Sequence, residues 1–376
     1  MVGNQTMGWL SKTLRKDLLS IEPYRPGKPV SELKREIGLH EIVRLSSNEN
    51  PWPLSDNVME AITDGADQPN RYPDPRSYRL RRVLASHWGV SPREILVGAG
   101  TEGILHSLFH AIIEPGDEVV TPVPTYPLYR LAAAASGAIC VRTLTAEDGS
   151  WPLEQVLSVC SEKTKALVLC NPNNPTGNIL DRTFLVNLAG ELDARGILMV
   201  VDEAYAEYVD DPDYLSGIEL FRQIGRVVIT RTFSKIYGLA GLRVAYAIAP
   251  KAIVETYDKI HPLFEVSRTA QRAAIASVEA KGYAESVRLR TVTERTRLAR
   301  EMTDLGLAVR TTCANFLLVR NDSSELLYES LLREGVIVRN GVDLEMPGYL
   351  RVTVGLPEEN DRLLNSLKKV LNRFGQ

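Results

Sequence analysis

The chain has 376 residues, of which 44% are hydrophobic and 24% charged, and its formal net charge is −3. A chain of this length exceeds the size at which one hydrophobic core keeps growing, so we expect two domains. The composition is typical of a globular protein and excludes long disorder. The near-neutral charge gives no electrostatic footprint for nucleic acid, so we expect no nucleic-acid partner.

The cysteines and the apolar segments indicate the compartment. The four cysteines contain no C-x-x-C pair, and four in so long a chain do not make a disulfide framework. No uninterrupted apolar stretch reaches membrane-spanning length, and residues 1–17 lack the apolar core and cleavage site of a secretory signal. We therefore expect a cytoplasmic protein with no membrane partner.

Residues 1–40 are polar and contain closely spaced prolines, so they predict an arm with a turn and a short helix over Val30–Ile37. From about residue 90, short β-rich runs alternate with helical ones such as Thr101–Ile113 and Arg182–Ala194. The predicted strands are Glu94–Val97, Glu118–Thr121, Ile139–Leu144, Ala166–Leu169, Ile197–Asp202, Arg226–Thr230 and Val244–Ala249. The alternation predicts an α/β domain over residues 41–260, with a mainly parallel seven-stranded sheet flanked by helices.

The pattern changes after about residue 260. A long charged helical region, Ala270–Met302, precedes short strands around Phe316–Val319, Val336–Val338 and Leu350–Val354. This order predicts a smaller α+β domain over residues 261–376.

Ligands of an open α/β sheet bind beyond the carboxyl ends of its strands, so the residues after each strand are the candidates. After the first strand, the segment Gly98-Ala99-Gly100-Thr101-Glu102-Gly103 opens a helix. Glycines admit a ligand close to the backbone, and a helix N-terminus presents free N–H groups to a phosphate. The segment also matches G-x-G-x-x-G, but the next strand does not end in the acid that a dinucleotide site requires. We interpret the segment as a phosphate site, with dinucleotide binding and a plain tight turn as alternatives.

Two loops follow other strands. Tyr126 lies in a proline-fixed loop, where its ring either stacks on a flat ligand or packs against the protein. The run Asn171-Pro172-Asn173-Asn174-Pro175-Thr176-Gly177 contains more turn-forming residues than a connection requires, although a tight loop is the simple alternative.

Two charged residues also lie after strands. Asp202 ends a strand of buried apolar residues, so it must be hydrogen-bonded or paired, either as a helix cap or with a cationic ring nitrogen. Lys235 is surrounded in sequence by Thr232, Ser234 and Arg243. A lone lysine is normally a surface residue, but this group can combine an amine nucleophile with phosphate ligands. Pyridoxal phosphate (PLP) needs a phosphate cradle, an aromatic platform, a carboxylate for its ring nitrogen and a lysine, and all four are present.

The chain resembles the fold-type I PLP-dependent aminotransferases, and within them the histidinol-phosphate aminotransferases. The similar segments are residues 23–29, Ser47–Pro51, Arg71–Asp74, Asn171–Gly177, Thr232–Lys235 and Leu350–Gly355. The resemblance covers nearly the whole chain. The resemblance implies an aspartate-aminotransferase-like fold that transfers an amino group between an amine or amino-acid donor and a 2-oxo acid.

The resemblance also implies how PLP is held. Lys235 forms a Schiff base with the cofactor and moves the substrate proton, and Asp202 keeps the pyridine nitrogen protonated. Tyr205 and Asn174 hydrogen-bond the phenolic oxygen of the ring, and Tyr126 stacks on the ring face. The phosphate-binding positions are Gly100, Thr101, Glu102, Thr232, Ser234 and Arg243. Tyr72 reaches the phosphate of the neighbouring subunit's cofactor, which implies a homodimer with shared active sites.

The substrate residues implied by the resemblance are Arg351 for a carboxylate, Tyr24 and Arg339 for a phosphate, and Asn174. The chain departs from the family pattern at Glu265, where an asparagine is usual, and at Arg268, where a small residue is usual. We expect Glu265 to lie near the substrate and these departures to change the substrate or the reaction.

Alternative functions remain open from the sequence. A PLP enzyme with these residues can also catalyse decarboxylation, β-elimination or oxidation of an amino acid. A dinucleotide oxidoreductase built on the glycine-rich segment leaves Asp202 and Lys235 unexplained. We expect no metal, because His106 and His110 lack a third ligand.

Overall fold

The computed structural model describes residues 13–19, 21–23, 32, 34–35, 38, 41–146 and 149–374. Most of the predicted arm lies outside these residues, as does most of the helix expected over Val30–Ile37. The part of the arm that is described includes one 3-10 turn, η1 (Lys16–Leu18).

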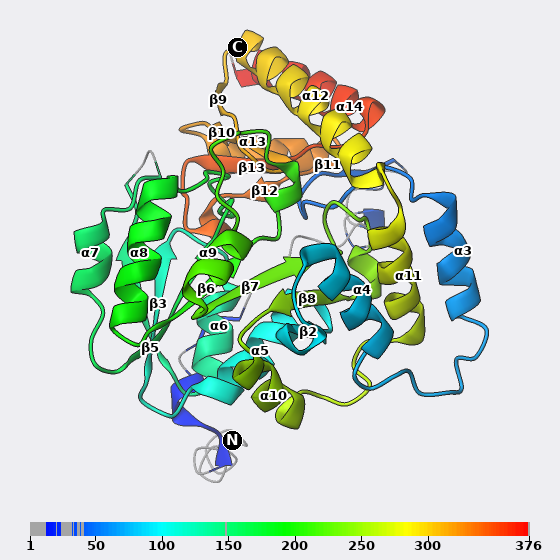
Figure 1. The fold of residues 1–376 in the computed structure, drawn as a ribbon. Coiled ribbons are helices and arrows are strands. Elements are labelled where there is room, and N and C mark those ends of the chain that lie inside the picture. The colour runs from blue at the N-terminus through cyan, green and yellow to red at the C-terminus, as the bar shows by residue number, and fades with distance from the viewer. Residues whose placement is uncertain are drawn as a thin grey trace, which may run out of the picture.

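A seven-stranded sheet occupies the centre of the larger part of the molecule (Figure 1). The strand order is β2-β8-β7-β6-β5-β3-β4, and β8 alone runs antiparallel to its neighbours. The bounds are β2 (Ile95–Gly98), β3 (Glu118–Val123), β4 (Ile139–Leu144), β5 (Thr164–Cys170), β6 (Leu198–Asp202), β7 (Val227–Thr232) and β8 (Ala245–Ile248). The predicted mainly parallel sheet is therefore confirmed, with strand ends shifted by no more than two residues.

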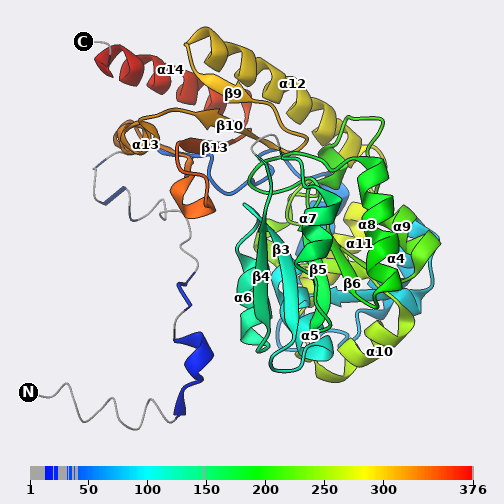
Figure 2. The same cartoon turned by 90° about the vertical axis from the view of Figure 1, so that its left-hand side faces the viewer.

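Helices cover both faces of this sheet. In Figure 2, β3 and β5 lie between α6 on one side and α8 on the other. The helices around the sheet are α3 (Asp56–Gly65), α4 (Tyr78–Trp88), α5 (Gly100–Ile112), α6 (Leu128–Ala135), α7 (Leu153–Ser158), α8 (Arg182–Ala194), α9 (Gly217–Ile224), α10 (Lys251–Ile260) and α11 (Arg268–Glu279), with 3-10 turns η2 (Pro92–Glu94), η3 (Ala206–Tyr208) and η4 (Ala240–Leu242). Every residue of β6 and β7 is buried, which explains why these strands are apolar on both faces.

Local sequence fixes where several helices begin and end. The side chains of Asp181, Ser216 and Ser267 accept hydrogen bonds from backbone N–H groups in the first turns of α8, α9 and α11. Gly89 and Gly225 end α4 and α9 in the left-handed conformation that glycine adopts without strain.

A second, antiparallel sheet has the order β12-β13-β10-β9 and packs with three helices above the first sheet (Figure 1). Its elements are β9 (Ala308–Arg310), β10 (Phe316–Arg320), β12 (Arg339–Asn340), β13 (Tyr349–Thr353), α12 (Tyr283–Asp304), α13 (Ser324–Arg333), α14 (Pro357–Phe374) and the 3-10 turn η5 (Val342–Leu344). The helical region expected over Ala270–Met302 is two helices, because Gly282 adopts φ +79° immediately before α12. Helix α11 contributes to the larger hydrophobic core, whereas α12 contributes Val287 to the larger core and Leu298, Ala299 and Met302 to the smaller one. The domain limits at residues 40 and 260 stay predictions.

The segment before α3 joins the two parts of the molecule. Strand β1 (Val43–Arg44) pairs in parallel with β11 (Val336–Ile337), and the amide of Thr353 donates to the carbonyl of Leu45. These bonds place the following residues, Ser46–Asn48, between the large sheet and the small one. None of the helices among the described residues combines the length and apolar character needed to cross a membrane.

Candidate active site

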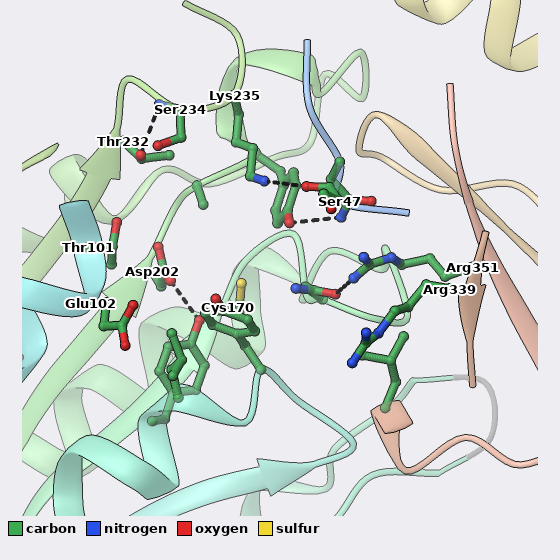
Figure 3. Close-up of a pocket in the computed structure, with 18 of the residues that line it drawn as sticks. Ser47, Thr101, Glu102, Cys170, Asp202, Thr232, Ser234, Lys235, Arg339 and Arg351 are labelled. Atoms are coloured by element: carbon green, nitrogen blue, oxygen red, sulfur yellow. Dashed lines mark hydrogen bonds between the residues drawn. The ribbon is translucent and has the colours of Figure 1, made fainter. Parts of the chain in front are cut away.

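A cavity of about 290 Å³ opens at the carboxyl ends of β5, β6 and β7 (Figure 3). It brings together most of the residues predicted from the sequence: Thr101, Glu102, Tyr126, Asn174, Asp202, Tyr205, Thr232, Ser234, Lys235, Arg243, Arg339 and Arg351. The remaining lining residues were not predicted, and they are Ser46, Ser47, Asn48, Leu128, Tyr129, Cys170, Ala204 and Leu344. The cavity therefore collects residues from both sheets and from the segment that joins them.

The carboxylate of Asp202 ends the central strand β6 and is 3% exposed. Its Oδ2 accepts a hydrogen bond from the Tyr129 hydroxyl at 2.7 Å, and its Oδ1 accepts one from Thr230 at 3.0 Å. Burial raises the pKa of Asp202, while these hydrogen bonds act in the opposite direction. A buried carboxylate that is held by neutral hydroxyls is suited to a cationic group in the cavity.

The amine of Lys235 enters the cavity from the segment after β7 and donates to the carbonyl of Ser47 at 3.0 Å (Figure 3). Burial lowers the pKa of Lys235 to about 8, and the positive charges of Arg351 and Arg243 contribute, with Glu49 opposing. At physiological pH, a larger fraction of such lysine side chains is neutral than for a lysine with the ordinary pKa. Such an amine can act as a nucleophile and as a proton carrier.

The start of α5 fits a phosphate group. The N-cap residue Ala99 makes no side-chain hydrogen bond, so the first N–H groups of the helix stay available. The hydroxyl of Thr101 is buried and has no hydrogen-bond partner among the described residues. Gly100 adopts φ +80°, and a Cβ there would collide with the guanidinium of Arg243. The backbone, the hydroxyl and the guanidinium thus form an electropositive cradle with room for an oxyanion.

Two arginines from the small sheet form the other side of the cavity (Figure 3). Arg351 on β13 is 5% exposed and donates to Asn174 Oδ1 at 2.5 Å and to the carbonyl of Ser46 at 2.7 Å. Arg339 on β12 is 4% exposed and lies 3.5 Å from Asp343. Two buried guanidinium groups on one wall favour a substrate that carries anionic groups.

Two tyrosines complete the walls of the cavity. The hydroxyl of Tyr205 accepts a hydrogen bond from the Asn48 amide at 2.9 Å, and burial raises the pKa of Tyr205. Tyr126 makes an edge-to-face contact with Tyr129, with ring centroids 5.8 Å apart. These contacts fix both aromatic side chains before any ligand binds.

Some predicted site residues do not line the cavity of this chain. Tyr72 is 79% exposed, and its ring stacks on Phe264 at 4.5 Å between centroids. Glu265 accepts a hydrogen bond from Tyr257 at 3.3 Å and lies behind the glycine-rich turn before α5, 3.4 Å from where a Cβ on Gly98 would stand. Tyr24 lies outside the described residues. The roles assigned to these three residues stay predictions.

The most informative residue that sequence reasoning missed is Tyr129. It follows Tyr126 at the spacing that places two side chains on one face of a helix, and this was the available signal. Ser47 and Asn48 lie in a segment that resembles the family, but no chemical property of these residues indicated a place in the cavity.

A neutralisable lysine, a buried carboxylate, an aromatic face and a phosphate cradle meet in one cavity at the carboxyl edge of the sheet, and these features define a PLP-dependent enzyme. The sequence model of the family aminotransferase class I and II matches residues 40–367, and the chain belongs to this family.

Individual relatives extend this result. The chain is 38% identical over 360 residues to histidinol-phosphate aminotransferase 2 of Carboxydothermus hydrogenoformans, covering 95% of this chain and 99% of the relative. It is 36% identical to the histidinol-phosphate aminotransferase of Caldicellulosiruptor saccharolyticus, with 95% and 99% covered. Among solved structures, histidinol-phosphate aminotransferase from Sinorhizobium meliloti in complex with pyridoxal-5'-phosphate gives a TM-score of 0.86 at 29% identity, covering 96% of this chain and 98% of that one.

The protein is therefore a PLP-dependent aminotransferase, which transfers an amino group between an amine or amino-acid donor and a 2-oxo acid. Of the functions that the sequence left open, family membership supports amino-group transfer over the other PLP reactions and over dinucleotide-dependent oxidation.

Proposed function

We propose that this enzyme transfers the amino group of histidinol phosphate, or of a closely similar phosphorylated amino alcohol, to a 2-oxo acid. The observation that carries the proposal is the pair of buried arginines, Arg339 and Arg351, opposite the cofactor cradle. Two relatives reported above, which are histidinol-phosphate aminotransferases, support the same substrate.

Different residues around the cavity contact different parts of the cofactor. The cofactor phosphate is held by the turn at Gly100–Glu102 together with Thr232, Ser234 and Arg243. Glu102 contributes its backbone N–H to this phosphate site, because its carboxylate would repel the phosphate. Asp202 pairs with the ring nitrogen, Tyr126 covers the ring face, and Tyr205 and Asn174 hydrogen-bond the ring's phenolic oxygen. When bound, PLP supplies an electron sink that stabilises negative charge on the substrate's Cα.

Lys235 is the proton carrier of the reaction. Its Nζ would move the proton between the substrate's Cα and C4′ of the cofactor during amino transfer. A pKa of about 8, set mainly by burial, lets the amine exist in both protonation states near neutral pH.

The two arginines serve the two substrates. Arg351 is held by Asn174 and the carbonyl of Ser46, so its guanidinium is oriented in advance for the carboxylate of the oxo acid. Arg339, with Tyr24, binds the phosphate of the amino donor. Asp343 holds Arg339 until the donor arrives, at a distance of 3.5 Å.

The active unit is a homodimer, in which Tyr72 of each subunit reaches the cofactor phosphate of the other. The exposure of Tyr72, Phe264 and the adjacent Leu263 supports this proposal, because large apolar side chains gather there on the surface. We also propose a cytoplasmic location, in keeping with four free cysteines.

The test is a single half-reaction without any acceptor. The PLP-loaded enzyme is mixed with histidinol phosphate or with histidinol, and loss of the visible band of the cofactor is followed. We expect histidinol phosphate to react at much lower concentration, and Arg339→Gln to remove this preference. Arg333→Gln, at an exposed position on α13 of the same domain, is the control. Equal reaction of the two compounds in the wild-type enzyme would contradict the proposed donor.

A further inference from the structure

Tyr129 connects two parts of the cavity that bear on the cofactor. It lies on α6 and is fully buried, and it is part of the cavity wall. Its hydroxyl donates to Oδ2 of Asp202 at 2.7 Å, and its ring meets the ring of Tyr126 edge to face. One side chain therefore supports both the residue proposed for the ring nitrogen and the residue proposed for the ring face.

The environment of Asp202 makes the hydroxyl donors important. The carboxylate is almost completely buried, and its two oxygens receive one side-chain hydroxyl each, from Tyr129 and Thr230. Burial favours the neutral carboxylic acid, and the neighbouring Glu203 adds to this effect, so the pKa of Asp202 is raised. The hydroxyls oppose the shift, because they donate to the charged form.

The neighbouring groups leave Tyr129 as a donor. Burial and the charge of Asp202 raise the pKa of the Tyr129 phenol, so its proton is retained. The thiol of Cys170 also has a raised pKa and donates to the carbonyl of Pro172 at 3.1 Å. The Tyr129 proton is therefore directed to the carboxylate.

We propose that Tyr129 is a positioning residue for PLP, whose hydroxyl keeps Asp202 ionised so that it can pair with a protonated ring nitrogen, and whose ring holds Tyr126 in place. The proposal rests on the proposed role of Asp202. This role differs from a purely structural one, because removal of the hydroxyl should lower the affinity for a ligand that carries the ring nitrogen more than the affinity for a ligand that lacks it.

The experiment compares two ligands of the apo-protein. One is PLP, and the other is an analogue in which a C–H group replaces the ring nitrogen; both dissociation constants are measured by equilibrium dialysis. We expect Tyr129→Phe to weaken PLP by about tenfold or more, the effect of losing a hydrogen bond to a charged group. The affinity for the analogue should change by less than about twofold, because its ring offers no cation to Asp202. The loss of PLP affinity should grow as the pH falls, because a less stabilised carboxylate takes up a proton at higher pH.

Tyr246→Phe is the matched control. Tyr246 lies on β8 and is also buried. Its hydroxyl accepts a hydrogen bond from Trp88 at 2.9 Å rather than donating to Asp202. It should leave the ratio of the two affinities unchanged. Tyr129→Leu is made in parallel, so that the ratio can be measured even if Tyr129→Phe does not fold.

The outcomes separate this inference from the proposal beneath it. If the Tyr129 variants weaken both ligands equally, the residue is structural and the inference is wrong. If Asp202→Asn keeps the wild-type ratio of the PLP and analogue affinities, the proposed pairing of Asp202 with the ring nitrogen is wrong. If Asp202→Asn loses the preference for PLP while the Tyr129 variants keep it, Asp202 acts as proposed but without help from Tyr129.

Discussion

The proposed cofactor end and the proposed substrate end of the cavity are built in different ways. The cofactor end uses residues at the ends of adjacent strands of one sheet, such as Asp202 and Thr232, and it is fixed by buried hydrogen bonds. The proposed substrate end uses Arg339 and Arg351 from the small sheet. Arg351 is oriented by Asn174 from a loop of the large part and by Ser46 from the segment between the two parts, and Arg339 lies 3.5 Å from Asp343. If these roles hold, one sheet sets the chemistry, whereas the choice of substrate depends on how separate segments meet.

The largest effect should follow from a change at the cofactor end. Lys235→Ala removes the proposed proton carrier, and we expect kcat to fall by at least about 10³-fold, in the upper range for general acid–base catalysis. The measurement is the steady-state rate with saturating PLP, together with the visible spectrum. Lys251→Ala, at an exposed site at the start of α10, is the control. A Lys235→Ala enzyme that kept a tenth of its activity would place the proton carrier elsewhere.

A change at the substrate end should act on KM. Arg351→Lys keeps the charge but loses the planar fork, and it leaves Asn174 Oδ1 and the carbonyl of Ser46 with a poorer donor. We expect KM for the 2-oxo acid to rise about ten- to hundredfold, and the affinity for PLP to change by less than about twofold. Initial rates at varied acceptor concentration give the first value, and dialysis gives the second. A comparable loss of PLP affinity would show that the two ends are not separable.

The depressed pKa of Lys235 predicts a pH dependence that couples the two ends. Covalent capture of PLP by the apo-protein requires the neutral amine. The capture rate should therefore rise about tenfold per pH unit and level off near pH 8, well below the usual range for lysine. Rapid-mixing absorbance measures this rate. Arg351→Gln should move the midpoint upward, because the positive charge of Arg351 is one cause of the lowered pKa. A wild-type midpoint near 10 would contradict the burial of the amine.

The same contrast explains what the sequence predicted. The buried parallel strands β5, β6 and β7 and the residues that follow them were predictable, because a buried parallel strand is a continuous apolar run and its ligand-facing residues come directly after it. The contribution of Ser46–Asn48 was not, because it depends on the pairing of β1 with β11, which lie far apart in the sequence. Nothing in local propensity encodes that pairing.

Glu265 illustrates a second limit of the sequence. Its departure from the family pattern was noticed, and the residue was expected near the substrate. In this chain its carboxylate lies behind the glycine-rich turn before α5, where Tyr257 donates to it and His261 lies 3.3 Å away. The local pattern shows that a residue is unusual, but the side of the turn on which it packs depends on α10 and on the segment that follows.

The smallest effect is expected where the two regions touch at the surface. Arg142 on β4 lies 2.6 Å from Glu345, which follows η5, and the two side chains are 42% and 43% exposed. Exposed ion pairs contribute about 0–1 kcal/mol, so Glu345→Gln should lower the free energy of unfolding by no more than this. High salt should abolish the difference in denaturant titrations. We expect KM for both substrates to stay within about twofold of wild type, because solvent screens this pair. A large rise in KM for the acceptor alone would show instead that this contact helps to hold the wall around Leu344 against the cavity, and that the substrate end depends on surface contacts as well as on its buried arginines.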